Sequence, residues 1–225
     1  MAAGTVCVGG QYSSRRPVTS GVPQGSVLGP ILFLIFINLE SCLTSSVKFA
    51  DDTKILGTVS TSDDKDILQQ DLQHVVDWAK QWQMQFNTSK CKVMHLCRHN
   101  DRFQHFTDGH LLDCDDEQKD LGVQVTADLK PSRECQTAHS KANKILGVIS
   151  RTFSYKGHDV LLQLYKSLAR PNLEYCISAR SPYYEKDKQL LERVKHSFTG
   201  MIPGIKQLSY EKRLQLIGLW SLEET

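Results

Sequence analysis

The chain has 225 residues, enough for one large or two small domains. Apolar residues make up 40% of it and charged residues 23%, which indicates a globular protein that forms a core. The net charge of +2 is too small to indicate nucleic-acid binding by itself, so any basic surface that binds nucleic acid must be a local cluster of Lys and Arg residues.

The cysteines, the N-terminus and the most apolar stretch indicate where in the cell the protein is expected. There are seven cysteines at irregular spacing, with no Cys-x-x-Cys pair, which argues for reduced thiols rather than a disulfide framework, and no disulfide partner is expected. The N-terminus lacks a secretory signal, and the most apolar stretch, Val27 to Leu39, is too short to span a bilayer. We therefore expect an intracellular protein of the nucleus or cytoplasm with no membrane partner.

The first elements in chain order are a strand pair, a loop and a helix. Residues 1–12, together with Ser13-Ser14-Arg15-Arg16, predict a short strand and turn. In the loop that follows, Pro23 fixes its own φ, Gln24 offers an amide that can donate and accept, and Gly25 permits close approach of a ligand. The helix over Ser26 to Asn38 is apolar nearly all round, so we expect it to lie buried under a sheet.

Two adjacent carboxylates interrupt the next apolar run. Val47 to Leu56 predicts a β-hairpin with Asp51 and Asp52 at its tip. Carboxylates held near 4 Å repel by about 1 kcal/mol in water and about 4 kcal/mol near a protein surface. A divalent cation with oxygen ligands offsets that repulsion. On Phe49-Ala50-Asp51-Asp52 alone, a solvated Asp-Asp turn accounts for the sequence equally well.

The remaining elements divide the chain near residue 130. An amphipathic helix, with Ser62-Asp63-Asp64 as its N-cap region, should run to Trp82. A turn at 87–89, strands at 92–96 and 121–125 and a weak strand near Leu111 should follow. Beyond residue 130 the spacing predicts only helices, at about 135–153, 160–169, 187–201 and 210–217.

Two further patterns leave alternatives open. Cys91, His95, Cys97 and His99 invite a zinc site, but residues 92–96 alternate like a strand and no second ligand pair follows at useful spacing. Basic residues that could form a local nucleic-acid footprint fit a solvated helix face just as well. They are Arg15, Arg16, Lys90, Lys92, Lys141, Lys144, Lys186, Lys188, Arg193 and Lys195.

The order and spacing of several blocks carry a family resemblance. Gly21-Val22-Pro23-Gln24-Gly25-Ser26 precedes Phe49-Ala50-Asp51-Asp52 by some twenty-five residues. Together they closely resemble the palm of reverse transcriptases from non-LTR retrotransposons, of the jockey-like and chicken-repeat-like (LINE) kind. Later blocks are similar to this family's following palm block, its primer-grip block and its thumb region. They are residues 82–94, 119–123, 141–147, 164–168, 170–176 and 210–214.

The resemblance implies a fold and a set of roles. The fold would be α+β: a palm fragment with a small antiparallel sheet over residues 1–130, then an all-helical thumb-like region over 131–225. The activity would be RNA-directed DNA polymerisation with two Mg²⁺ ions, on an RNA template, a DNA primer and dNTPs. Asp51 would be the main metal ligand and Asp52 the accessory carboxylate. Lys90 would act on the leaving pyrophosphate, and Pro23, Gln24, Gly25, Phe49 and Ala50 would border template and substrate.

The sequence also departs from the family pattern. Relatives place another catalytic aspartate upstream of the Pro-Gln-Gly block, whereas the seventeen residues before Val18 contain no Asp or Glu. Leu39 stands where the family usually has an aspartate, and Ser178 to Pro182 lack the usual tryptophan. We therefore expect this chain to be an inactive polymerase fragment. The alternatives are a non-catalytic remnant that binds RNA or primer–template, and an element-derived product without function.

Overall fold

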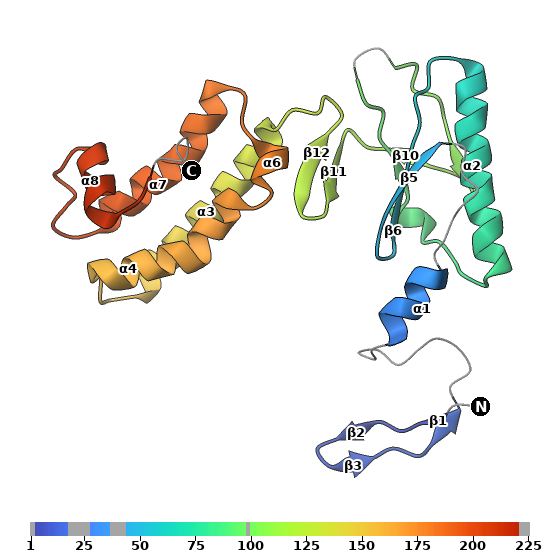
Figure 1. The fold of residues 1–225 in the computed structure, drawn as a ribbon, viewed down its shortest axis with the longest axis horizontal. Coiled ribbons are helices and arrows are strands. Elements are labelled where there is room, and N and C mark those ends of the chain that lie inside the picture. Colours follow the sequence, from blue (N-terminus) through green and yellow to red (C-terminus); the bar gives the residue numbers. More distant parts are fainter. Residues whose placement is uncertain (1–2, 18–27, 37–43, 98–99, 221–225) are drawn as a thin grey trace. The chain divides into compact units, whose positions relative to one another are not determined.

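The computed structural model describes residues 3–17, 28–36, 44–97 and 100–220 (Figure 1). Backbone contacts group the chain into two compact units. The first comprises Met1–Thr88 with His105–Leu111, and the second comprises Ser89–Gln104 with Leu112–Thr225. The architecture is mixed, with small sheets and helices, as the α+β class requires. The domain boundary near residue 130 stays a prediction.

The N-terminal residues form a long antiparallel hairpin. Strand β1 (Ala3–Gly4) pairs with β4 (Arg16–Pro17), and β2 (Cys7–Val8) pairs with β3 (Gln11–Tyr12). The turn between β2 and β3 is Gly9-Gly10, and both glycines have positive φ, which only glycine adopts without strain. The predicted strand and turn are confirmed, and the pairing extends to Pro17.

The apolar helix forms, but its predicted burial is wrong. Helix α1 (Leu28–Phe36) carries Leu34 with 68% and Ile35 with 71% of their surface exposed. The physical reason is the size of the sheets, because every sheet among the described residues has only two strands. A lone hairpin offers too little surface to cover a helix.

The first unit is organised around helix α2 (Ser62–Gln81), which buries Val75, Val76 and Ala79. Its N-cap is Thr61, within one residue of the predicted region, and Thr61 and Asp64 form a capping box. Strands β5 (Ser45–Phe49) and β6 (Asp52–Leu56) precede it, and α2 contacts β6. Strands β8 (Phe106–Thr107) and β9 (His110–Leu111) return to α2, where the Gln69 side chain exchanges two hydrogen bonds with the Phe106 backbone.

The strands of the second unit are shorter than predicted. Strand β7 (Lys92–Val93) replaces the strand expected over 92–96, and it pairs in parallel with β10 (Asp113–Cys114), whereas the other sheets are antiparallel. Strand β11 (Glu117–Asp120) pairs with β12 (Val123–Thr126). The strand expected over 121–125 starts late because Leu121 and Gly122 form the turn between them, both with positive φ. The 3₁₀ turn η1 (Thr88–Lys90) confirms the predicted turn.

From residue 132 onward the described elements are all helical, as predicted. They are α3 (Ser132–Thr152), α4 (His158–Leu164), the π-helical turn η2 (Tyr165–Ala169), α5 (Arg170–Glu174), α6 (Ile177–Arg180), α7 (Glu185–Met201) and α8 (Tyr210–Ile217). Helices α3 and α7 pack along each other, and the core between them and η2 contains a stacked pair. The rings of Tyr165 and Phe198 lie 4.1 Å apart between centroids, at 14° between planes.

Candidate active site

The hairpin that carries the two aspartates forms as predicted. Strands β5 and β6 pair in register from Ser45 opposite Leu56 to Phe49 opposite Asp52. Ala50 and Asp51 are the two central residues of the turn, and Ala50 has a φ of +51°. A positive φ at the first central residue is typical of the primed turns that fit the twist of a two-residue hairpin. Asp51 and Asp52 therefore lie at the tip.

The two faces of this hairpin differ in exposure. Successive strand residues point to opposite faces. Ser46, Lys48, Thr53 and Ile55 are half-buried, whereas on the other face Val47, Phe49, Asp52 and Leu56 are exposed and only Lys54 is half-buried. Phe49 keeps 60% of its surface in solvent. The exposed face thus places an aromatic ring directly across the strands from one of the two carboxylates.

The two aspartates at the tip are open to solvent. Both side chains are exposed, and within the described part of the chain neither carboxylate has a hydrogen-bond or ion-pair partner. No third Asp, Glu, His or Cys among the described residues completes a cluster with them. Two carboxylates suit Mg²⁺, which commonly takes one or two protein carboxylates and completes its octahedron with waters and substrate phosphates.

A buried aspartate on α2 holds the base of the hairpin through two hydrogen bonds. The carboxylate of Asp71, fully buried on α2, accepts from the backbone N–H of Thr44 at 2.7 Å and from its hydroxyl at 2.5 Å. After β6, Gly57 lies against the same helix, where an added Cβ would meet Leu68 Cδ1 at 3.3 Å. The Asp71 hydrogen bonds thus hold the chain just before β5, and the chain just after β6 lies close to α2.

Sequence reasoning missed Asp71, although a signal was present. The apolar residues Leu68, Leu72, Val75 and Val76 define the buried face of α2, and Asp71 falls among them at helical spacing. A carboxylate on such a face must be paired, so its position alone predicts a structural hydrogen bond.

Phe49 and Ala50 adjoin the two aspartates in the hairpin, whereas the structure does not place the other predicted site residues relative to the tip. Pro23, Gln24 and Gly25 lie outside the described residues. Lys90 is exposed at the end of η1 and belongs to the second compact unit, so its distance from the hairpin of the first unit is not defined. Their roles, and those of Phe49 and Ala50, stay predictions.

The described residues give the zinc alternative no support. His95 is buried, and its Nε2 lies 3.5 Å from Sγ of Cys114 rather than from Cys91 or Cys97. Burial lowers the pKa of His95, with a smaller contribution from the charge of Arg102. His99 lies outside the described residues, and the described part of the chain contains no cluster of three metal-binding side chains.

Of the basic candidates, those on α3 share one face. Lys141 and Lys144 are exposed, and Arg151, which the sequence analysis did not include, is exposed on the same face. The only acid of this helix, Glu134, is buried and accepts from the Gln124 N–H at 2.7 Å. The series on α7 is interrupted, because Lys195 is buried and its Nζ donates to the carbonyl of Trp220. The α3 face is thus a basic stripe without an exposed acid on the same helix.

Comparison with known proteins gives a consistent family match. The family model described as "Reverse transcriptase (RNA-dependent DNA polymerase)" matches residues 4–150. The "RNA-directed DNA polymerase from mobile element jockey" of Drosophila melanogaster is 35% identical over 103 residues, which cover 38% of this chain and 11% of that protein. The protein of the same name from Drosophila funebris is 30% identical over 193 residues, 77% of this chain and 20% of that protein.

The matches cover only a part of each relative. The chain spans a tenth to a fifth of the length of these two relatives. No solved structure gives a significant match. None of the helices that the structure describes is both long and apolar enough to cross a membrane.

Proposed function

This chain belongs to the reverse transcriptase (RNA-dependent DNA polymerase) family, and from that premise we propose that it is part of the polymerase of a jockey-like non-LTR retrotransposon. Residues 1–130 would form part of the palm and residues 131–225 the thumb-like region. The observation that carries the proposal is the Asp51-Asp52 pair, exposed at the tip of a two-residue hairpin within the matched region.

The proposed roles follow from the position of each residue. Asp51 in the turn is the principal ligand for Mg²⁺, and Asp52 at the start of β6 is the second carboxylate, nearer the primer end. Bound Mg²⁺ would supply charge neutralisation at the triphosphate and lower the pKa of the attacking 3′-hydroxyl. Phe49 and Ala50 shape the surface beside the carboxylates. Pro23, Gln24 and Gly25 would contact the nascent base pair, and Lys90 would neutralise or protonate the pyrophosphate that leaves.

We further propose that the 225-residue polypeptide does not polymerise by itself. Two-metal transfer requires carboxylates that clamp both the attacking and the leaving oxygen. The hairpin supplies two, and the family's third aspartate, expected before the Pro-Gln-Gly block, has no counterpart among residues 1–17.

Primer extension on an RNA template, with Mg²⁺ or Mn²⁺, tests this proposal. We expect no incorporation of dNTPs above background. Robust incorporation that Asp51→Ala abolishes would show that the polypeptide holds a complete site, whereas incorporation unaffected by Asp51→Ala would indicate a contaminating polymerase.

A second candidate function is binding of RNA or primer–template without catalysis, and the basic stripe on α3 favours it. Phosphate contacts from Lys141, Lys144 and Arg151 would release counterions, so the affinity should fall steeply with salt. We expect Lys141→Gln with Lys144→Gln to weaken RNA binding and to reduce the salt slope by about two. The matched control is Lys206→Gln with Lys212→Gln, exposed lysines outside α3. Equal losses in both double variants would refute a role for the stripe.

A further inference from the structure

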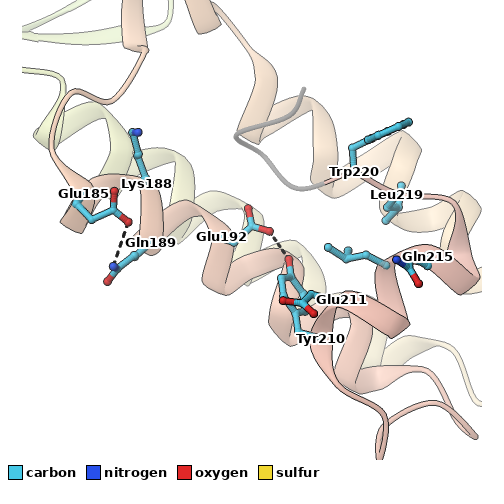
Figure 2. Close-up of a pocket in the computed structure, with 10 residues that line it drawn as sticks. Glu185, Lys188, Gln189, Glu192, Tyr210, Glu211, Gln215, Leu219 and Trp220 are labelled. Carbon is cyan, nitrogen blue, oxygen red and sulfur yellow. Dashed lines mark hydrogen bonds between the residues drawn. The ribbon is translucent and has the colours of Figure 1, made fainter.

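Two cavities of the second unit differ in the chemistry of their walls. The larger, of about 510 Å³, lies between α7, α8 and the segment that follows α8, and none of its described lining residues is a cysteine or a histidine (Figure 2). The smaller, of about 350 Å³, has His95 and Cys97 in its lining, together with Arg102 and Asp116. Imidazole and thiol groups change protonation near neutral pH, so the smaller cavity adjoins groups that are suited to proton transfer.

The histidine of the smaller cavity lies beside a second cysteine. His95 keeps only 8% of its surface in solvent, and its Nε2 lies 3.5 Å from Sγ of Cys114. Cys114 itself is exposed on β10. The thiols of Cys7, Cys97 and Cys176 are exposed as well, but none of these three has a histidine nitrogen beside it in the part of the chain that the structure describes. Cys114 is thus the exposed thiol with a base at hydrogen-bond distance.

The surroundings of His95 favour its neutral form. Burial lowers the pKa of His95, and the charge of Arg102 lowers it further. A hydrogen bond with Asn100 and the charge of Asp116 act in the opposite direction and are the smaller contributions. The Asn100 side chain is itself held, since its amide donates to the carbonyl of Leu96 at 3.3 Å and its oxygen accepts from the next-but-one backbone N–H at 2.9 Å. A neutral imidazole has one nitrogen that can accept a proton.

The charges around Cys114 bear on which reagents can approach it. Asp113 and Asp116 form ion pairs with a lysine and an arginine, at 2.7 Å and 3.3 Å. Asp115 accepts from the amide of a glutamine, which does not offset its charge. These neighbours leave one negative charge next to the thiol. An anionic reagent is therefore repelled, whereas a small uncharged reagent is not.

We propose that Cys114 is a site of oxidation by a peroxide, with His95 as the base that takes the thiol proton. Nε2 of His95 accepts the proton as Sγ attacks one oxygen of hydrogen peroxide. An S–O bond forms and the O–O bond breaks, so that the sulfur is oxidised to a sulfenic acid and the peroxide is reduced. The leaving hydroxide takes the proton back from His95 and becomes water. A sulfenic acid is reversible, and polymerisation has no use for this thiol.

Treatment of the reduced 225-residue chain with hydrogen peroxide at pH 7, followed by trapping with dimedone and mass spectrometry of each cysteine peptide, tests the proposal. We expect the dimedone adduct to form faster at Cys114 than at the other three exposed cysteines of the same molecule. His95→Gln should slow the reaction at Cys114 by about tenfold or more. The loss stays below the largest effects of a general base, because the few per cent of a thiol that is ionised at pH 7 reacts without one.

The matched control and the pH profile address the role of His95. His110→Gln changes an exposed histidine and should leave the rate at Cys114 unchanged. An ordinary thiol reacts about tenfold faster for each unit of pH below its pKa of about 8.5. The rate at Cys114 should rise less between about pH 6.5 and 7.5, because a base with a lowered pKa is already neutral there.

The outcomes separate a reactive site from an ordinary exposed thiol. A preference for Cys114 that His95→Gln removes and His110→Gln keeps would support the proposal. Equal rates at the four exposed cysteines of the wild-type chain would overturn it, and this comparison does not depend on the folding of any variant. A preference that persists in His95→Gln, with a circular dichroism spectrum like that of the wild type, would exclude His95 as the base. If that variant does not fold, a tenfold rise per pH unit at wild-type Cys114 would exclude it instead.

Discussion

The hydroxyl of Tyr175 donates to the backbone carbonyl of Leu121 at 2.5 Å, across 54 residues of sequence. The same ring lies beside Gly122, where an added Cβ would meet it at 3.3 Å. The turn between β11 and β12 is therefore held by the residue that ends α5. The sequence blocks that resemble the primer-grip and thumb regions of the family meet at this contact.

The first prediction concerns Gly122. Gly122 and Gly204 have nearly the same φ, +88° and +84°, but only Gly122 has a neighbour within reach of a Cβ. Gly204→Ala should cost the conformational strain alone, about 1 kcal/mol, whereas Gly122→Ala should cost measurably more because the Tyr175 ring must move. Urea unfolding of both variants measures the difference. Equal costs would mean that the ring yields freely.

The second prediction isolates the hydrogen bond of Tyr175. Tyr175→Phe keeps the ring beside Gly122 and removes only the donor to Leu121. Because the site is exposed, we expect a loss near the lower end of the usual range of about 0.5–1.5 kcal/mol. The unfolding midpoint in urea provides the measurement. Tyr183→Phe, at another exposed tyrosine, is the control and should leave the midpoint unchanged.

The third prediction concerns the start of α2. The hydroxyl of Thr61 accepts from the N–H of Asp64 at 3.2 Å, and the carboxylate of Asp64 accepts from the N–H of Thr61 at 2.9 Å. Thr61→Ala should lower the free energy of unfolding by about 1 kcal/mol. Thr58→Ala, three residues earlier and outside the cap, is the matched control. An equal effect of both changes would contradict a capping role.

The fourth prediction is a pH dependence at Asp128. The Thr126 hydroxyl, then the ammonium and backbone N–H of Lys130, lower the pKa of Asp128 from 3.8 to about 2. Since the folded pKa lies below the unfolded one, the stabilisation is fully present above pH 3.8 and is lost as the pH falls toward 2. A carbon-13 NMR titration of the side-chain carboxyl measures this pKa directly. Asp128→Asn should remove the corresponding slope in stability, and a titration near pH 4 would disprove the prediction.

The fifth prediction tests the core of the second unit. Phe198 is fully buried and stacks on Tyr165, so Phe198→Ala should cost about 3–5 kcal/mol. Leu216→Ala, at an exposed position of α8, should change stability by no more than about 0.5 kcal/mol. Thermal unfolding of the two variants makes the comparison. Similar midpoints would mean that the helices do not share one core.

Local sequence signals predicted the elements well where the side-chain period and the turn chemistry agree. The Asp51-Asp52 hairpin, the amphipathic α2 and the terminal helix α8 all lie where periodicity and polar breaks place them. The family match, which bears on the two aspartates, was likewise visible in the motifs alone.

The rest depends on contacts that no local pattern encodes. Burial of α1 was predicted from its apolar surface, but burial also needs a sheet large enough to cover the helix, and each sheet among the described residues has two strands. The strand expected over 92–96 is only two residues long in the structure, because only Lys92 and Val93 pair with β10. Lys195 was one candidate for a basic nucleic-acid footprint, with a solvated helix face as the alternative, but it is buried and donates to a carbonyl 25 residues later in the chain.

The buried Asp71 has a mechanical consequence for the candidate site. It pins the hairpin at Thr44, while roughly 14 Å of strand separates Ser45 from Phe49 at the other end. The Asp71 contact therefore holds the hairpin at its root, at the opposite end from the two aspartates. A substitution at Asp71 or Gly57 that loosens the root would therefore shift the tip, and it would change the metal binding proposed for the two aspartates without altering either carboxylate.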